Sequence, residues 1–232
     1  MTSRRAFDAT DAIVVPHAIA VPSHDLHDYR SMFVLAEADL QAGPILDVGG
    51  AAGTFGAQLR ARGGQVLAVD PLYTLPGAVL LEAVRRTARQ SAAEASEQPG
   101  RFHFAVAQDP ETYFSAWTDN ANRFVVDYHP DGRNYLPLRR GLDVPSGQFA
   151  LTLVNHFVHV RPDAPEGDEL VGFVLELVRV THGEVRIFPV AEGLRLRSLV
   201  ERLARAHVVT VLEQSRHRCR RGATSMLVVA AA

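Results

Sequence analysis

Apolar and polar residues follow one another along this chain in blocks that alternate between strand-like and helix-like patterns. Mostly apolar runs, typical of strands buried on both faces of a parallel sheet, occupy residues 45–48, 66–69 and 149–157. Segments with apolar residues at helical spacing lie among them, at residues 24–33, 76–96, 109–128, 169–180 and 194–206. Ser23 is the expected N-cap of the first of these helices. The pattern predicts an α/β fold built around a largely parallel sheet.

The last part of the chain predicts how the sheet ends. Further strands are expected at residues 134–138, 184–189, 207–212 and 224–229. The last two are separated by an arginine-rich turn, residues 216–222, with no helix between them. A connection of that kind makes a hairpin, so the final strand should run antiparallel to its neighbour. We expect a seven-stranded, mostly parallel sheet with an antiparallel last strand and helices on both faces.

The same pattern predicts the domain organisation of the chain. Residues 1–22 resemble an irregular arm, and residues 23–232 form a single domain that contains the whole sheet. Residues 108–130 contribute an extra helix between the second and third strands, with Asp109 as N-cap and Pro110 in the first turn. Its aromatic stripe is more often a core feature than a substrate pocket, although the helix is a candidate substrate cover. Residues 102–106 alternate like a short strand or an extended connector.

Composition narrows the function classes. The 232 residues carry a net charge of −2, and all 24 basic residues are arginine, so no basic field favours nucleic-acid binding. Cys219 is the only cysteine, which suits a reducing compartment. No run approaches the roughly 20 apolar residues of a membrane span. We therefore expect a soluble, cytoplasmic protein, monomeric or homodimeric, without a membrane or nucleic-acid partner.

The turn after the first predicted strand carries the strongest chemical signal. A dinucleotide fingerprint needs glycines at the first, third and sixth positions of its loop. Counting from Gly49 or Gly50 places Ala51 or Ala52 at the third position, so a nicotinamide dehydrogenase is disfavoured. The spacing that fits is an acid, Asp47, two residues before Gly49, with Gly53 four residues after it.

This loop resembles the acid-x-Gly-x-Gly-x-Gly loop of class I S-adenosylmethionine (SAM)-dependent methyltransferases, with Ala51 in place of the middle glycine. From about residue 24 to the end, the chain is similar to one little-characterised bacterial family of these enzymes. The similarity is carried by residues 29–33, 70–73, 149–157, 184–189 and 221–227. It implies the Rossmann-like class I methyltransferase fold and SAM as the cofactor.

The resemblance also implies roles for individual residues. Gly49, Gly50 and Gly53, with Ala51 between them, should flank the methionine and ribose of SAM. Asp70, at the end of the second strand, should accept both ribose hydroxyls, and Pro71 and Leu72 should pack on the adenine. Asn155 and His156 should face the sulfonium and the acceptor. Asp47 should hold the loop or meet the amino group of the methionine.

Methyl transfer to oxygen or nitrogen needs alignment and, for some acceptors, a base. His156 is the preferred base, because it titrates near neutral pH at the cofactor end of a buried strand. The alternative is a structural histidine bonded to a backbone carbonyl. His159, His129 and Tyr29 are weaker candidates, and Tyr29 and His159 are expected to contact the substrate.

Metal-dependent chemistry is not indicated, because the ten histidines are scattered and no acid cluster follows the fourth strand. The sequence therefore predicts a SAM-dependent methyltransferase acting on an oxygen or nitrogen atom of a small molecule, with no metal. The aromatic helix suggests an apolar or aromatic acceptor. The alternative is a catalytically inactive SAM-binding protein of the same fold with an interaction or regulatory role.

Overall fold

The computed structural model of this protein describes residues 19–104, 109–130, 132–138, 142–156, 165–191, 193–217 and 219–231. One seven-stranded sheet runs through them, in the order β3-β2-β1-β4-β5-β7-β6. Its strands are β1 (Ile45–Val48), β2 (Val66–Asp70), β3 (Tyr135–Pro137), β4 (Phe149–Asn155), β5 (Thr181–Val190), β6 (Val208–Gln214) and β7 (Ser225–Ala231).

The register confirms the predicted fold class. β1 pairs in parallel with β2 and β4, and β2–β3 and β4–β5 are also parallel. β7 is antiparallel to both β5 and β6, so it is the reversed strand that the hairpin pattern predicted. This strand order, with a reversed β7 between β5 and β6, is the class I methyltransferase fold. The carboxyl ends of β1, β2 and β4 lie at one edge, where open α/β sheets bind ligands.

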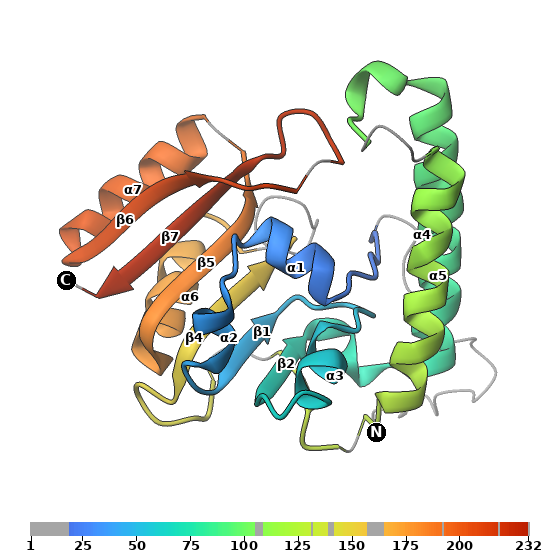
Figure 1. The fold of residues 1–232 in the computed structure, drawn as a ribbon. Helices are drawn as coiled ribbons and strands as arrows, with labels where there is room; N and C mark the ends of the chain where they lie inside the picture. The colour runs from blue at the N-terminus through green and yellow to red at the C-terminus, as the bar shows by residue number, and fades with distance from the viewer. Residues whose placement is uncertain are drawn as a thin grey trace, which may run out of the picture.

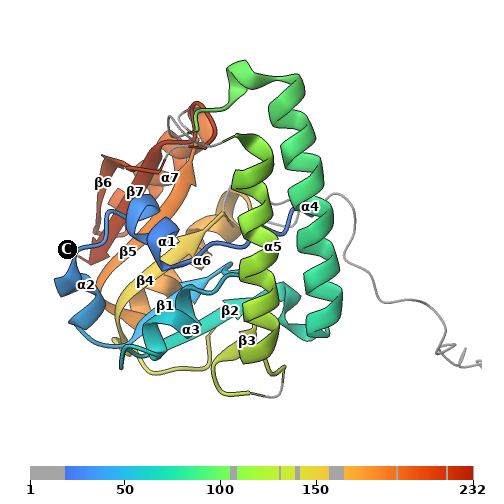
Figure 2. The ribbon, with the colours of Figure 1, turned by 45° about the vertical axis from the view of Figure 1, so that its right-hand side comes forward.

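Helices cover the sheet in three groups (Figures 1 and 2). α6 (Gly167–Val180) and α7 (Leu194–Arg205) pack on one face, and α1 (Leu26–Met32), α2 (Glu37–Gln41) and α3 (Phe55–Arg60) pack on the other. α4 (Gly77–Glu97) and α5 (Pro110–Asp127) run side by side next to β2 and β3. Two short 3₁₀ turns, η1 (Pro71–Thr74) and η2 (Pro99–Arg101), flank α4.

Each helix group has its own hydrophobic core. Leu177 and Leu199 of α6 and α7 pack with Val185 of β5, while Phe55 of α3 packs with Ile45 on the opposite face. The predicted aromatic stripe forms the third core, where Phe124 of α5 packs with residues of α4 and β3. The N-cap of α5 is Asp109, as predicted, and its side chain accepts a hydrogen bond from the Thr112 N–H at 2.8 Å.

The first helix differs from its prediction in a way that matters for the site. The helical pattern began at His24, but α1 begins at Leu26 with Asp25 as its N-cap. The Ser23 hydroxyl instead donates to the Ala52 carbonyl at 2.7 Å. Residues 23 and 24 are therefore held against the glycine-rich loop, because the Ser23 hydroxyl bonds to Ala52 and the His24 carbonyl accepts the Thr54 N–H.

Residues 102–106 do not continue as a strand where the structure describes them. Phe102 makes one isolated antiparallel bridge with Arg220, and residues 103 and 104 belong to no strand. The predicted segment is thus a connector up to residue 104, and residues 105 and 106 lie outside the described ranges. Residues 1–18 of the predicted arm lie outside them as well.

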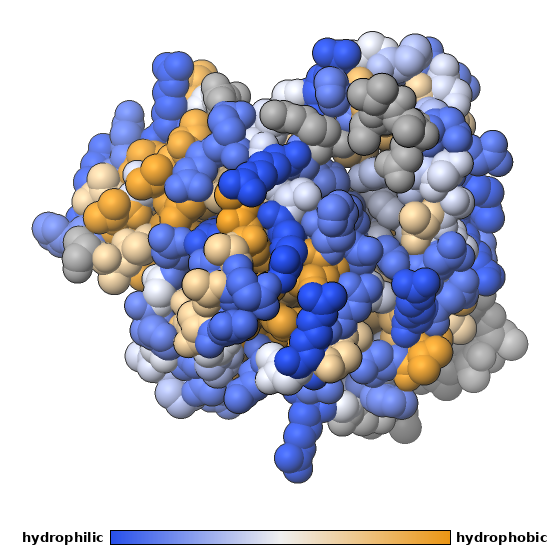
Figure 3. Space-filling view, in the orientation of Figure 1, coloured by the Kyte–Doolittle hydropathy of each residue, from blue (hydrophilic) through white to orange (hydrophobic). Residues whose placement is uncertain are grey.

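An apolar patch lies over β6 and β7, at the outer end of the sheet (Figure 3). Val209 and Val211 of the edge strand β6 are 51% and 50% exposed there. None of the helices that the structure describes is long and apolar enough to cross a membrane.

Candidate functional site

The loop after β1 is fastened by the acid that ends β2. Gly49 and Ala51 both have left-handed backbone angles, with φ of +74° and +47°. The Ala51 N–H donates to Asp70 Oδ2 at 3.1 Å, and the Leu72 N–H donates to Asp70 Oδ1 at 2.8 Å. Because Asp70 is fully buried, its carboxylate ties the loop to the start of η1. Ala51 keeps the backbone angle that the replaced glycine would favour, at a cost of about 1 kcal/mol.

Two loop glycines are required by packing within the protein. A Cβ at Gly50 would lie 2.5 Å from Asp47 Oδ2. A Cβ at Gly53 would lie 2.7 Å from the carbonyl oxygen of His24. That carbonyl accepts the Thr54 N–H at 2.9 Å, so the segment before α1 is bound directly to the start of α3.

The Gly53→Ala variant is therefore expected to lose about 1–3 kcal/mol of unfolding free energy, because the added methyl group meets rigid backbone. Urea denaturation measures the loss. Gly100→Ala is the matched control, since nothing lies within 4 Å of a Cβ built there. A Gly53→Ala variant as stable as Gly100→Ala would contradict the close approach of residue 24 to the loop.

A chain of hydrogen bonds joins α1, β1 and β4 beneath the loop. The Tyr29 hydroxyl donates to Asp47 Oδ1 at 2.8 Å, and Asn155 Nδ2 donates to the Tyr29 hydroxyl at 3.0 Å. The amide oxygen of Asn155 then lies 2.6 Å from His156 Nδ1. Since an amide oxygen only accepts, Nδ1 of His156 carries the proton and Nε2 is left as the acceptor nitrogen. The Tyr29 ring is fixed by stacking on Phe55, with ring centroids 4.1 Å apart.

Burial shifts the pKa values of the side chains that this series of hydrogen bonds connects. Burial raises the pKa of Asp47 to about 7, although the hydrogen bond from Tyr29 opposes the shift. The pKa of Tyr29 is raised well above its ordinary value by burial and by the neighbouring Asp47. Burial lowers the pKa of His156 well below its ordinary value, and the neighbouring His24 adds to the shift. The imidazole of His156 is consequently neutral at physiological pH.

His156 is also conformationally unusual. It follows the last residue of β4 with φ of +50°, and its N–H donates to the carbonyl of Phe188 at 2.8 Å. A non-glycine residue in this left-handed region costs free energy, and such strain concentrates at functional sites. The strained backbone at His156 is thus consistent with its predicted place in the site.

A cavity of about 390 Å³ opens beside the loop, and we call it the loop cavity. Its wall is made by the segment before α1, the glycine-rich loop, α4, α5, the ends of β4 and β5, and the turn between β6 and β7. The lining residues are Ala20, Pro22, His24, Gly49, Ala51, Thr87, Ser91, Phe114, Trp117, Asn155, His156, Phe188, Pro189, His217, Cys219, Arg220 and Ala223.

The predicted site residues divide into two groups. Gly49, Ala51, Asn155 and His156 line the loop cavity. The others do not line it; they are Tyr29, Asp47, Gly50, Gly53, Asp70, Pro71 and Leu72. Tyr29, predicted to touch substrate, is fully buried and acts through Asp47 and Asn155 in this structure. His159 lies outside the described residues.

Two further histidines, His24 and His217, meet in the cavity wall, and no motif in the sequence marks them. The His24 ring stacks on His156 with centroids 5.2 Å apart, and it meets the edge of His217 at 5.9 Å. Trp117 of α5 contacts the same ring at 5.2 Å. In the sequence, His24 lies at the start of a predicted helix and His217 lies in the arginine-rich turn. Their positions along the chain do not predict that the two side chains line the same cavity.

The turn that carries His217 is held by α1. The N–H groups of Arg216 and His217 donate to the Ser31 carbonyl at 2.9 and 3.1 Å, and the Ser215 hydroxyl donates to it at 3.0 Å. Burial lowers the pKa of His217 to about 4. Within the described residues, no group of three or more His, Cys, Asp or Glu side chains could hold a metal ion.

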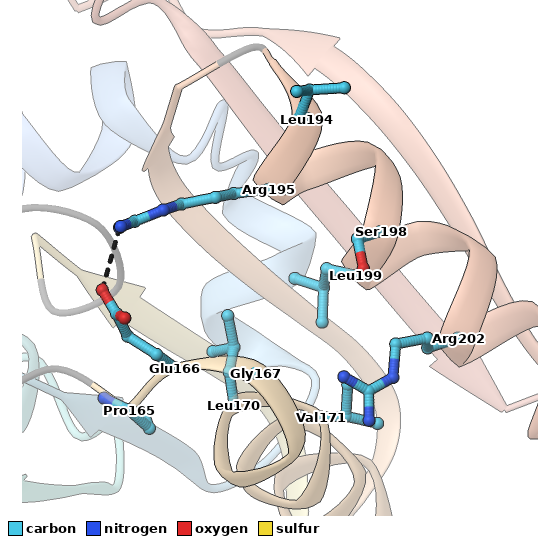
Figure 4. A pocket seen from close by; sticks show the side chains of 10 residues that line it. All are labelled: Pro165, Glu166, Gly167, Leu170, Val171, Leu194, Arg195, Ser198, Leu199 and Arg202. Carbon is cyan, nitrogen blue, oxygen red and sulfur yellow. Dashed lines mark hydrogen bonds and ion pairs between the residues drawn. The ribbon is translucent and has the colours of Figure 1, made fainter.

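A second hollow, of about 310 Å³, lies between α6 and α7 (Figure 4). Its charged side chains are already paired: Arg195 Nη1 lies 2.9 Å from Glu166 Oε1, and Arg202 pairs with Asp168. None of the predicted site residues lines it. The loop cavity is therefore the better candidate for a functional site.

No protein-family model and no curated protein sequence matches this chain. Several solved structures resemble it in fold. The glycopeptide N-methyltransferase MtfA, solved with SAM, is 8% identical with a TM-score of 0.42, and the match covers 82% of each chain. The mitomycin 7-O-methyltransferase MmcR is 12% identical with a TM-score of 0.42, over 89% of this chain and 54% of MmcR.

A third structure comes from work on the conversion of a disulfide bond into a thioacetal group during echinomycin biosynthesis. It is 12% identical with a TM-score of 0.43, over 81% of this chain and 74% of the other. Similarity at this level lies in the arrangement of strands and helices.

Proposed function

We propose that this chain is a SAM-dependent methyltransferase that transfers a methyl group to an oxygen or nitrogen atom of a small-molecule acceptor. The observation that carries the proposal is the meeting of two elements at the carboxyl edge of the sheet. There the glycine-rich loop after β1, with Gly49 and Ala51, shares the loop cavity with Asn155 and His156 at the end of β4. Ligands of open α/β sheets bind at this edge.

The described residues fit the amino-acid end of SAM better than its ribose end. Gly49 has no Cβ to obstruct a ligand at the loop, and Asn155 and His156 supply polar atoms in the cavity. Asp70, the expected partner of the ribose hydroxyls, lies beneath the loop and is engaged by two backbone N–H groups. We expect Asp70 to meet a ribose only when the Ala51 contact opens. When bound, SAM supplies a methyl carbon that its sulfonium makes electrophilic.

The protein's own contribution is alignment and exclusion of water. Trp117, Phe114 and Phe188 give the loop cavity an apolar wall, which favours a desolvated acceptor. Asn155 holds His156 in one tautomer through the bond to Nδ1. Among the residues predicted from the sequence, His156 is the candidate to receive a proton from the acceptor.

A catalytically inactive SAM-binding protein is the second candidate. The observation that favours it is the closed Asp70, whose side chain is fully buried under the left-handed Ala51. This candidate shares the cofactor but predicts no turnover with any acceptor.

The proposal also covers the family, the cellular location and the oligomeric state of the protein. We propose that the chain belongs to the bacterial methyltransferase family that its motifs resemble, and that it works in the cytoplasm as a monomer or homodimer. The single cysteine, Cys219, supports a reducing compartment.

Calorimetric titration tests the cofactor. SAM and S-adenosylhomocysteine are expected to bind the wild type with micromolar affinity, and NAD is not expected to bind. Asp70→Asn should weaken both adenosyl ligands by about 10- to 100-fold, because charge-assisted hydrogen bonds contribute about 1.5–3 kcal/mol each. Asp119→Asn is the matched control, since Asp119 is exposed on α5, away from the loop cavity.

Three outcomes separate the candidates. Adenosyl binding that falls in Asp70→Asn but not in Asp119→Asn supports the cofactor site, and turnover with an acceptor panel then decides between enzyme and inactive protein. Binding that is equal in both variants would place the ribose elsewhere. A wild type that binds neither adenosyl ligand would refute the proposed function.

A further inference from the structure

One buried imidazole in the loop cavity has an unsatisfied nitrogen. The His24 side chain is 2% exposed, and no atom of the described residues makes a hydrogen bond to its Nε2. Leaving a buried polar atom unpaired costs about 1–3 kcal/mol, so such an atom calls for a partner, either a water, an ion or a ligand. His24 lines the cavity in which we place the methyl transfer.

Both the backbone and the side chain of His24 are fixed. Its carbonyl accepts the Thr54 N–H at 2.9 Å, which binds the residue to the glycine-rich loop. Its Nδ1 lies 3.2 Å from Asp28 Oδ2 in the first turn of α1. Burial raises the pKa of Asp28, but the hydrogen bond and charge of His24 lower it below its ordinary value. Asp28 is therefore an ionised acceptor and Nδ1 of His24 donates to it, so that Nε2 is the nitrogen with the lone pair in the neutral form of the ring.

This pairing gives His24 an advantage over His156 as a base. An imidazole that gains a proton becomes positive, and a carboxylate at Nδ1 stabilises that charge as well as fixing the tautomer. At His156 the corresponding partner is the neutral amide of Asn155. His156 and His217, which face His24 from the end of β4 and from the β6–β7 turn, are both held neutral by burial.

The cavity wall also indicates what kind of acceptor fits. Arg220 is its one formally charged lining residue in the described ranges, and that guanidinium already makes two bonds to Glu94. The aromatic rings of Phe114, Trp117 and Phe188 supply apolar surface. A volume of about 390 Å³, part of which the methyl donor would use, leaves room for a small acceptor. An uncharged aromatic ring with one hydroxyl group matches this wall and supplies the missing donor to Nε2.

This step rests on the methyltransferase function proposed above. We infer that His24, positioned by Asp28, accepts the proton from the hydroxyl group of an uncharged, single-ring phenolic acceptor. As the O–H proton moves to Nε2, the phenolic oxygen forms a bond to the methyl carbon of the donor. The carbon–sulfur bond breaks, and its electron pair stays on sulfur as a thioether. The products are an aryl methyl ether, S-adenosylhomocysteine and a His24 imidazolium, which returns its proton to water.

A cofactor-free measurement tests the acceptor site. The full-length protein, labelled with ¹⁵N in its histidines, is titrated with 4-ethylphenol and followed by imidazole NMR, with His24 assigned from the His24→Gln spectrum. The His24 Nε2 signal should be that of an unprotonated nitrogen and should move on addition of the phenol. 4-Ethylanisole, which lacks the O–H donor, should leave it unchanged. A protonated Nε2, or no response up to the solubility limit of the phenol, overturns the inference.

Turnover tests the proton transfer. With SAM and 4-ethylphenol, His24→Gln should lower kcat for S-adenosylhomocysteine release about 100-fold or more, with the KM for SAM unchanged. His27→Gln is the matched control, because His27 is an exposed histidine in the first turn of α1, three residues after His24. Asp28→Asn should shift the pH–rate profile, since it removes the charge that stabilises the imidazolium, whereas a merely structural role would leave the profile in place.

The failures of the two proposals are distinguishable. A wild type that binds no SAM refutes the methyltransferase function, and the NMR titration then decides the phenol site alone. A wild type that binds SAM but neither methylates 4-ethylphenol nor shows a His24 shift overturns the inference and leaves the cofactor site intact. A His24→Gln variant with kcat within threefold of the wild type also overturns it.

Discussion

At about pH 8, the Asp47→Asn variant is expected to be about 4 kcal/mol more stable to unfolding than the wild type, and the difference should vanish near pH 4. The reason is burial, which raises the pKa of Asp47 from 3.8 to about 7. A shift of about three units corresponds to about 4 kcal/mol, at about 1.4 kcal/mol per unit. Asparagine keeps the acceptor for the Tyr29 hydroxyl and never acquires the charge.

The sign follows from the direction of the shift. A carboxyl group with a raised pKa favours the folded state in its neutral form, so its stabilising contribution is present below pH 3.8. That contribution is lost as the pH rises through about 7. Urea denaturation of both proteins from about pH 4 to about pH 8 measures the difference at each pH. Asp119→Asn, an exposed acid, should show a small and constant difference. A pH-independent difference for Asp47→Asn would mean that Asp47 is ionised throughout.

Tyr29→Phe is expected to lower the unfolding free energy by about 2–4 kcal/mol at neutral pH. The hydroxyl group that it removes donates to Asp47 and accepts from Asn155, and all three side chains are buried. Each polar atom left unpaired costs about 1–3 kcal/mol. The ring itself stays, so the stacking on Phe55 should be preserved.

Two controls separate the hydrogen bonds from other effects of the substitution. Tyr113→Phe removes a hydroxyl whose two partners are both weak, His217 Nε2 at 3.4 Å and the thiol of Cys219, and should cost less than about 1 kcal/mol. The double variant Tyr29→Phe/Asp47→Asn tests coupling, because the loss at residue 29 should shrink when residue 47 cannot ionise. A Tyr29→Phe cost equal to that of Tyr113→Phe would contradict the central position of this hydroxyl.

The strands and long helices were predictable because their patterns are periodic and local. The mostly apolar run 149–157 predicted a doubly buried strand, and β4 is buried along its whole length. The missing helix between the last two strands predicted the reversed β7 correctly. The 5-residue helix α2 was not anticipated, because one short turn carries too few apolar residues to show a period.

The start of α1 shows why a cap can be misassigned. Ser23 and Asp25 are both good N-cap residues, and the sequence does not say which one meets a competing partner. In the fold the Ser23 hydroxyl is used by the Ala52 carbonyl, and Asp25 caps the helix by accepting the Asp28 N–H. The same tertiary contact places His24 in the cavity wall.

The sequence predicted residues of the candidate site only where a local motif contained them. The loop spacing and the polar end of β4 led to Gly49, Asn155 and His156, and all three line the loop cavity. His24 and His217 were missed because they are separated by almost the whole chain and meet only after the sheet has formed. The roles of Asp70, Pro71 and Leu72 in binding the adenosyl group stay predictions.

The hydrogen bonds from residues 215–217 to Ser31 also constrain the order in which the protein can be completed during synthesis. The two partners are 184 residues apart, so α1 is synthesised long before the turn that holds it. At about 5–20 residues per second, that interval is on the order of 10–40 s. Until the turn arrives, His24 has no His217 to face and one wall of the loop cavity is missing. A nascent chain can therefore form the β1–β4 half of the sheet before it has a closed cavity, and ligand binding becomes a property of the finished chain.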